Sequence, residues 1–185
     1  HVGFVFQNPD HQIFCSTTKE EIAFGPTALG LDGATVFKRV DEMLTLFDLH
    51  CYEDVSPATL GYGERRAVAL SSVLAMRTPI LVLDEPESNL DFRNQMVVLN
   101  VIERLTEQGL GAVINTHFPA HALEISTKTL LVPRHRPPIF GDTRDVMTED
   151  LLSDVFDVRV RIRELDFPER RYTCVAAVEP RHGGA

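Results

Sequence analysis

The sequence is poor in several features that mark a function class. It contains no tryptophan and three isolated cysteines, Cys15, Cys51 and Cys174, with no C-x-x-C pair among them. An odd number of dispersed cysteines favours neither a disulfide framework nor a zinc knuckle, so we expect ordinary thiols in a reducing cytosol. No segment reaches the roughly 18 uninterrupted apolar residues of a membrane span, so a membrane-spanning chain is not expected.

Positive charge is also scarce. The chain has 18 Lys and Arg against 27 Asp and Glu, a formal net charge of −9. So acidic a chain is repelled by the phosphates of nucleic acids and by anionic lipid surfaces, and no nucleic-acid partner is expected. What remains is average for a folded domain: 185 residues, of which 44% are hydrophobic and 24% are charged. This composition predicts a globular chain with a sizeable core.

Short apolar runs alternate with amphipathic stretches along most of the chain. Strands are predicted over residues 2–6, 80–83 and 112–115, and helices from 33 to about 47 with Asp32 as the cap, over 63–76 and over 92–108. The run 80–83 is typical of a strand buried on both faces of a parallel sheet, and 112–115 is predicted as the next buried strand. This order predicts an α/β fold with a mainly parallel sheet. Ligands of such sheets bind beyond the carboxyl ends of the strands, where Asp84, Glu85 and His117 fall.

The last fifty residues have a different pattern. A short helix is predicted over 149–156, followed by a strand that pairs with residues 172–178. In that strand the apolar residues Val158, Val160 and Ile162 alternate with Arg159, Arg161 and Arg163. We interpret the arginines as the solvated face of a half-exposed strand, because the chain as a whole is acidic.

Two adjacent carboxylates follow the apolar run 80–83. Asp84-Glu85 at a strand end is the form expected where one carboxylate holds Mg²⁺ and its neighbour polarises an attacking water. By itself the pair is equally compatible with an acidic turn that starts the next helix. The surrounding spacing favours chemistry, because residues 60–66 precede the pair, residues 88–91 follow it directly, and Thr116-His117 closes the next strand.

Five segments in this order resemble the ATP-binding cassette (ABC) ATPases, the nucleotide-hydrolysing subunits of membrane transporters. Residues 5–9 resemble the glutamine loop, 60–66 the family signature, 80–86 the Walker B strand, 88–91 the D-loop, and His117 the switch histidine. The resemblance covers residues 2 to about 132. Within it, residues 7–14 and 21–26 are similar to cobalt/nickel and energy-coupling-factor importers, whereas 148–156 are similar to the ends of siderophore and cobalamin importer ATPases.

The resemblance implies roles for individual residues and implies ATP and Mg²⁺ as cofactors. Gln7 and Asp84 would hold Mg²⁺, Glu85 would act as general base on the attacking water, and His117 would hydrogen-bond the γ-phosphate. The implied nucleotide-binding residues are Gly61, Tyr62, Gly63, Glu64, Ser88 and Asp91. His117 and His121 also have the spacing of a metal pair, but Pro119 lies between them and no third ligand is adjacent, so zinc is not favoured.

The chain departs from the family pattern in two places. The usual signature is Leu-Ser-Gly-Gly-Gln, whereas this chain has Gly61 in place of the serine and Tyr62 in place of the first glycine. Loss of the serine hydroxyl would cost about 1.5–3 kcal/mol of phosphate binding. The chain also contains no G-x-x-x-x-G-K-[ST] loop to cradle phosphates, and it opens with His1 inside a strand pattern. We therefore expect an N-terminally truncated chain that is inactive alone, the complete form being an ATPase.

The resemblance implies a division of the chain and a set of partners. Residues 1–7 would end a core strand and the glutamine loop, 8–78 would form a helical signature subdomain, 79–132 the second half of the catalytic core, and 133–185 a small α+β extension. The complete form would dimerise with a second ATPase subunit on the inner face of the cell membrane and drive import of a metal ion, metal chelate or vitamin through integral membrane subunits. Two alternatives remain: a non-catalytic remnant that docks on a membrane partner, and an ABC ATPase outside transport.

Overall fold

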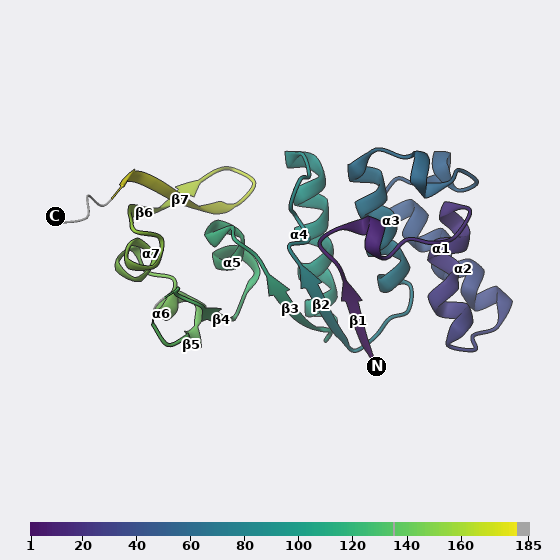
Figure 1. Ribbon diagram of the computed structural model, residues 1–185, viewed down its shortest axis with the longest axis horizontal. Coiled ribbons are helices and arrows are strands. Elements are labelled where there is room, and N and C mark those ends of the chain that lie inside the picture. The colour runs from purple at the N-terminus through teal and green to yellow at the C-terminus, as the bar shows by residue number, and fades with distance from the viewer. Residues whose placement is uncertain (135, 181–185) are drawn as a thin grey trace. The chain divides into compact units, whose positions relative to one another are not determined.

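The computed structural model describes residues 1–134 and 136–180 and divides into two compact units, His1–Asn115 and Thr116–Ala185 (Figure 1). Residues 135 and 181–185, which belong to the predicted C-terminal extension, lie outside the described residues. Among the helices of the described ranges, none is long and apolar enough to cross a membrane. The four predicted segments of the chain stay predictions.

The first unit is an α/β unit built on a parallel sheet. Its elements are β1 (Val2–Val5), η1 (Pro9–His11), α1 (Thr18–Ala28), α2 (Gly33–Leu46), η2 (His50–Tyr52), η3 (Pro57–Thr59), α3 (Tyr62–Leu74), β2 (Ile80–Asp84), α4 (Phe92–Glu107) and β3 (Gly111–Asn115). The strand order is β1-β2-β3, and both pairings are parallel. Because parallel neighbours need crossover connections, α1 to α3 lie between β1 and β2 in the chain, and α4 lies between β2 and β3. The predicted α/β class is confirmed.

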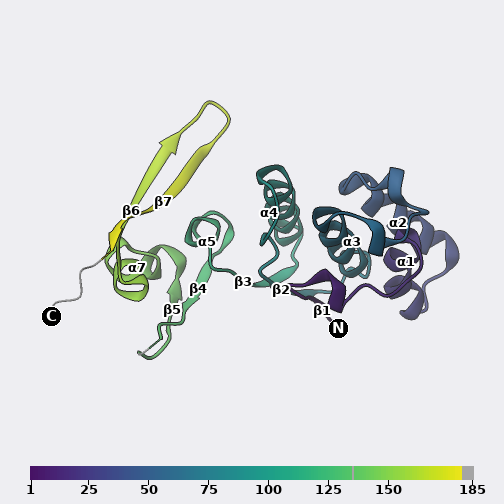
Figure 2. The same cartoon turned by 45° about the horizontal axis from the view of Figure 1, so that its top comes forward.

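The sheet of the first unit is buried on one face only. Val5, Leu81 and Leu83 are at most 1% exposed, whereas the alternate positions Ile80 and Val113 are 45% and 60% exposed. Figure 2 shows α3 and α4 on the same side of these strands. The expectation that 80–83 is buried on both faces and that 112–115 is a buried strand was therefore wrong. A continuous apolar run shows that both faces avoid charge, but which face is covered depends on where the helices pack.

Three helices form a second core in the first unit. Apolar side chains of α1, α2, α3 and the connection after α2 meet in one buried cluster: Ile22, Val40, Leu44, Leu49, Leu60, Val68 and Ala75. As predicted, Asp32 caps α2 by accepting a hydrogen bond from the Thr35 amide at 3.0 Å. Helix α1 was not predicted, because Pro26 inside it and weak periodicity hide it. Its Thr17–Glu20 capping box was the signal that could have revealed it.

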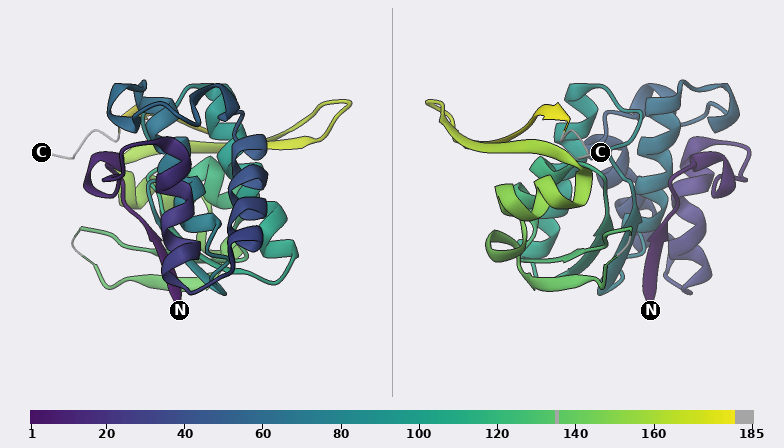
Figure 3. Two further views of the ribbon diagram at one scale, coloured as in Figure 1. Left: turned by 90° about the vertical axis from the view of Figure 1, so that its right-hand side faces the viewer. Right: turned by 60° about the vertical axis from the view of Figure 1, so that its left-hand side comes forward.

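The second unit contains two antiparallel strand pairs and short helices. Its elements are α5 (Pro119–Ile125), β4 (Lys128–Leu131), β5 (Ile139–Asp142), α6 (Thr143–Val146), α7 (Glu149–Phe156), β6 (Val158–Asp166) and β7 (Arg171–Pro180). Strand β4 pairs with β5 and β6 pairs with β7, both antiparallel. Figure 3 shows β6 and β7 as one long two-stranded ribbon. Helix α7 ends at Phe156, and the C-cap residue Asp157 has the left-handed φ of +53°.

The strand β6 confirms the predicted half-exposed pattern. Val160 is buried with Met147 and Leu152 in a small core, whereas the intervening arginines are exposed. The Glu149 carboxylate accepts hydrogen bonds from the Ile162 amide and from the guanidinium groups of Arg161 and Arg163, each at 2.8 Å. The arginine face is thus held by a carboxylate of this chain, in keeping with a solvated strand face.

Candidate functional site

Five polar side chains form two hydrogen-bonded groups beyond the carboxyl ends of β1, β2 and β3. The Gln7 side-chain amide donates to the Glu85 carboxylate, with 2.6 Å between Nε2 and Oε2, across 78 residues of sequence. The same Oε2 atom accepts a hydrogen bond of 2.7 Å from the Ser88 hydroxyl. The Asn115 side chain, at the end of β3, donates to Asp84 Oδ1 at 2.7 Å. Parallel strands bring these ends to one edge of the sheet, where the predicted site residues Gln7, Asp84 and Glu85 lie together with Asn115, to which no role was assigned. The chemical roles of these residues stay predictions.

The turn after β2 holds Glu85 in an unusual backbone conformation. Its φ is +44°, in the left-handed region that residues with a side chain rarely adopt. The conformation is held from both sides, because the Glu85 amide donates to the Asn115 carbonyl at 2.8 Å and its carbonyl accepts from the Ser88 amide at 3.1 Å. Asn89 is also left-handed, with φ +60°. Two such residues reverse the chain between β2 and α4 and keep Glu85 beside Gln7.

The signature segment begins helix α3. Gly61 is the N-cap, without a side-chain hydrogen bond, and Tyr62, Gly63 and Glu64 are the first three helical residues. Backbone N–H groups at such a helix start have no partner within the helix and attract anions such as phosphate. A side chain at position 61 would contact the Glu64 carboxylate, so the serine of the usual signature would fit here only if Glu64 moved.

The start of α3 lies against the start of α4. A β-carbon at Gly63 would lie 3.4 Å from the Asn94 side-chain nitrogen, which is an ordinary van der Waals contact. Asp91 caps α4, its Oδ1 accepting from the Asn94 amide at 2.8 Å. Asp91 and Ser88, predicted to bind nucleotide, thus make hydrogen bonds within the chain, and their role toward nucleotide stays a prediction.

A residue to which the sequence assigned no role lies at the centre of the site. Arg66, on α3, is fully buried. Its guanidinium donates to five backbone carbonyls: those of Phe6, Gln7 at 2.5 Å, Asp84 at 2.9 Å, Glu85 at 2.7 Å and Pro86 at 3.3 Å. A charged residue among the apolar positions of α3 was the one available signal, because buried arginine is rare unless it is paired.

Burial lowers the pKa of the Arg66 guanidinium from its ordinary value, while the nearby Tyr62, Glu87 and Asp84 act in the opposite direction. Arginine is the most basic of the protein side chains, so the group stays protonated at neutral pH. The cation therefore offers all its donors to the carbonyls around it, and these bonds are of the stronger, charge-assisted kind.

The predicted switch histidine belongs to the second unit. His117 lies two residues beyond β3, and its ring centroid is 4.2 Å from that of Phe118, which in turn is 5.1 Å from His121. Within residues 1–134 and 136–180, no group of three or more His, Cys, Asp or Glu is arranged to hold a metal ion. The role of His117 toward a phosphate stays a prediction.

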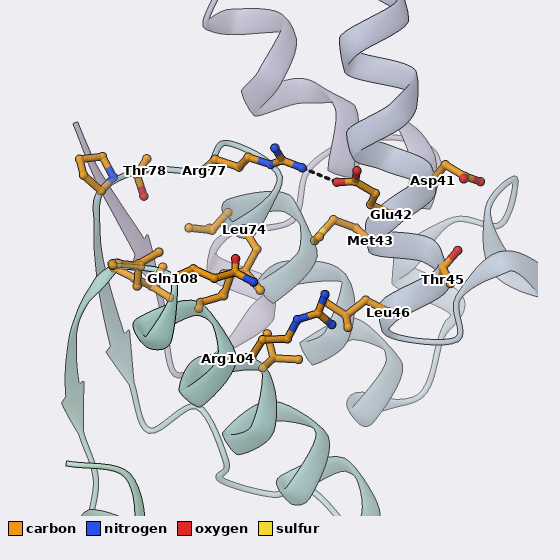
Figure 4. Close-up of a pocket in the computed structure, with 17 residues that line it drawn as sticks. Asp41, Glu42, Met43, Thr45, Leu46, Leu74, Arg77, Thr78, Arg104 and Gln108 are labelled. Atoms are coloured by element: carbon orange, nitrogen blue, oxygen red, sulfur yellow. Dashed lines mark hydrogen bonds and ion pairs between the residues drawn. The ribbon is translucent and has the colours of Figure 1, made fainter.

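A cavity of about 670 Å³ in the first unit lies away from this cluster. It opens between α2, the turn from α3 to β2, and the end of α4, and an ion pair between Arg77 and Glu42, 2.5 Å apart, crosses its edge (Figure 4). It adjoins the start of β2 rather than its carboxyl end, and none of the predicted site residues lines it. The chemistry of the site therefore does not extend to this cavity.

Comparison with known proteins places the chain in a family. The family model described as "AAA domain, putative AbiEii toxin, Type IV TA system" matches residues 16–120, more than half of the sequence. Proteins of Caldanaerobacter subterraneus and Pyrococcus furiosus, both named "putative ABC transporter ATP-binding protein", are 37% and 40% identical to it over 150 residues. The chain belongs to this AAA-domain family, and it is similar to ABC-type ATP-binding proteins.

The match covers only part of the length of these ABC-type relatives. It covers 81% of this chain but 26% of the Caldanaerobacter protein and 58% of the Pyrococcus protein, so the chain spans less than two thirds of either. Among solved structures, cbiO1 of Clostridium perfringens, part of the ABC transporter complex cbiONQ, is 27% identical with a TM-score of 0.68, covering 83% of this chain and 61% of that one. A structure described as "an inward-facing conformation of a putative metal-chelate type ABC transporter", 23% identical, shares the fold with a TM-score of 0.79 over 96% of this chain and 72% of that one.

The residues of the site fit the metal that ABC ATPases use. The Asp84 carboxylate and the Gln7 side-chain oxygen are hard ligands of the kind Mg²⁺ prefers, and Mg²⁺ is usually held by one or two carboxylates with water and phosphate completing its shell. Nucleotide fits less completely. The start of α3 offers N–H groups for phosphate, but the 185 residues contain no glycine-rich loop with its lysine.

Proposed function

We propose that this chain is the part of an ABC importer's ATPase subunit that carries the catalytic carboxylate and the signature helix. The observation that carries the proposal is the hydrogen bond of 2.6 Å between Gln7 and Glu85, which come from strand ends 78 residues apart. A glutamine amide and a carboxylate that share one edge of a parallel sheet can hold a water molecule between them and a metal-bound phosphate. The carboxylate is then the base.

In this proposal Glu85 is the general base. Its carboxylate is held by the Ser88 hydroxyl and the Gln7 amide, so one oxygen is fixed in direction while the group can still accept a proton from water. Asp84 and Gln7 would hold Mg²⁺, which supplies charge neutralisation to the phosphates when bound. His117 would donate to the γ-phosphate, and the remaining nucleotide contacts would come from the start of α3, with Ser88 and Asp91.

For the cargo we propose a metal ion, metal chelate or vitamin. Residues 7–14 and 21–26 support the cobalt/nickel and energy-coupling-factor branch, and so does the likeness to cbiO1 of the cbiONQ complex. Residues 148–156 support a siderophore or cobalamin importer instead. Both branches import a small cargo with an ATPase subunit on the inner face of the membrane.

The proposed partners are integral membrane subunits and a second ATPase subunit. Phe14 and Phe24 support the first of these, because both are more than half exposed and their rings pack edge to face with centroids 4.7 Å apart. Both belong to the predicted helical subdomain and lie close in sequence to Gln7. An apolar helix end of a membrane subunit would cover this pair and sense the position of the glutamine loop.

A non-catalytic docking module is the second candidate, because the 185 residues lack the glycine-rich loop that supplies most phosphate contacts. Calorimetric titration of Mg²⁺-ATP separates the two candidates when it is done on the chain itself and on a chimera. The chimera carries, ahead of Val2, a segment of an ABC ATPase that contains G-x-x-x-x-G-K-[ST]. We expect no binding at micromolar ATP by the chain, and both binding and hydrolysis by the chimera.

The matched control is the Glu85→Gln chimera, which keeps size and hydrogen bonding but removes the base. It should bind ATP like its parent and hydrolyse it about 10²–10⁴ times more slowly. A folded chimera that binds ATP but hydrolyses it equally well with glutamine at position 85 would refute the role of Glu85. Micromolar ATP binding by the chain alone would refute the need for the glycine-rich loop.

A further inference from the structure

Both partners of the Gln7–Glu85 hydrogen bond are attached to a single guanidinium. Arg66 donates to the backbone carbonyl of Gln7 at 2.5 Å and to that of Glu85 at 2.7 Å. The two residues thus depend on α3 for the placement of their backbones, although their side chains meet each other directly. Arg66 is fully buried, so water cannot readily replace these bonds.

A second residue of α3 contacts the same peptide. The Tyr62 hydroxyl donates to the Gln7 carbonyl at 3.3 Å. Tyr62 and Arg66 are four residues apart on one helix and therefore lie on the same face. With two donors on one carbonyl oxygen, the peptide after Gln7 has a fixed orientation, and this fixes the direction in which the Gln7 side chain leaves the backbone. A glycine at position 62 could not make this contact.

We propose that Arg66, assisted by Tyr62, is a positioning residue that fixes the backbones of Gln7 and Glu85 to the signature helix. Displacement of α3 is then passed directly to the contact between the glutamine amide and the catalytic carboxylate. The regulatory part of this inference rests on the proposed function, because only phosphate bound at the start of α3 would displace that helix. The attachment itself is a property of the 185-residue chain.

The attachment is measured by solvent exchange of the Gln7 side-chain amide protons, followed by nuclear magnetic resonance in the 185-residue chain. Tyr62→Phe removes one hydroxyl and should speed this exchange about fivefold, the effect expected from one ordinary hydrogen bond. Arg66→Lys should speed it about tenfold or more, because an ammonium group is a point donor that cannot reach carbonyls on two separate segments. Tyr52→Phe, in the same unit, is the matched control and should leave it unchanged.

A purely structural role would give a different pattern. General destabilisation by either variant would also speed exchange of the Leu29 amide, which is bonded to the Gly25 carbonyl in α1. Equal acceleration at Gln7 and Leu29, or Gln7 exchange within twofold of the parent in folded Tyr62→Phe, would overturn the proposal. If Arg66→Lys does not fold, Tyr62→Phe alone decides. A chimera without ATPase activity would count against the proposed function and leave this measurement unaffected.

Discussion

Replacing Arg66 by methionine should destabilise the first unit strongly. Methionine is a shorter, unbranched apolar side chain and has none of the donors of arginine. Of the five carbonyls, that of Glu85 keeps the Ser88 amide and that of Gln7 keeps the Tyr62 hydroxyl. Three oxygens lose the donor that reaches them from α3, those of Phe6, Asp84 and Pro86.

The magnitude follows from the cost of these three acceptors. Each buried acceptor without a donor costs about 1–3 kcal/mol. Part of this cost is offset in the methionine variant, because folding no longer has to take a cation out of water. We expect a net loss of about 3–5 kcal/mol in the free energy of unfolding, a large share of the 5–15 kcal/mol that is typical of natural domains.

Urea denaturation followed by far-ultraviolet circular dichroism measures this loss, because most of the helix lies in the first unit. Arg39→Met is the matched control: Arg39 donates to the carbonyls of Ala75 and Met76, at 2.9 and 3.1 Å, from a half-buried position. It should cost about 1–2 kcal/mol. A loss below about 1 kcal/mol for Arg66→Met, or a loss no larger than the control's, would refute the reasoning.

Three further predictions concern other parts of the chain. Thr17→Ala removes the cap of α1 and should lower the free energy of unfolding by about 1 kcal/mol in the same urea assay, with Thr27→Ala, inside α1, as a control. The Ile162 amide, more than the two arginines, holds the pKa of Glu149 below its ordinary value. The stabilisation of the folded state by this carboxylate is therefore complete above the unfolded-state pKa, near 4.3, and is lost as the pH falls through the lower folded-state pKa. Thermal melts from pH 6 to pH 3 should show a smaller drop for Glu149→Gln than for the parent, and equal drops would contradict the assignment. Burial, with Glu21, raises the pKa of the Cys15 thiol to about 11, so at pH 8 an aromatic disulfide reagent should modify the exposed Cys51 and Cys174 first, and Cys15→Ser should abolish the slow phase.

The elements with strong local signals could be predicted from the sequence. Helix α2 has regular apolar spacing and a capping aspartate, and the strand β6 alternates between valine or isoleucine and arginine. Both patterns depend on neighbours within a few residues, so the sequence contains the whole signal. Helix α1 lacks such periodicity, and its dependence on packing against α2 and α3 is why it was missed.

The candidate site, too, could be predicted from the sequence only in part. Asp84, Glu85 and Gln7 could be proposed from sequence because each sits in a recognisable segment next to a strand. The burial of the strands could not, since the exposed positions Ile80 and Val113 are as apolar as the buried Leu81. Apolar character shows what a face tolerates, and only the placement of helices decides which face is covered.

By itself, the sequence determined the α/β class, the chain order of most elements of the parallel sheet unit, and the likeness to ABC ATPases, because these follow from local periodicity and from ordered motifs. The tertiary structure alone decided that Glu85 lies 2.6 Å from Gln7 and that one buried arginine attaches both to α3. Backbone carbonyls are the acceptors for Arg66, and every residue has one. No pattern of side chains could therefore show which carbonyls a folded chain would bring to that guanidinium.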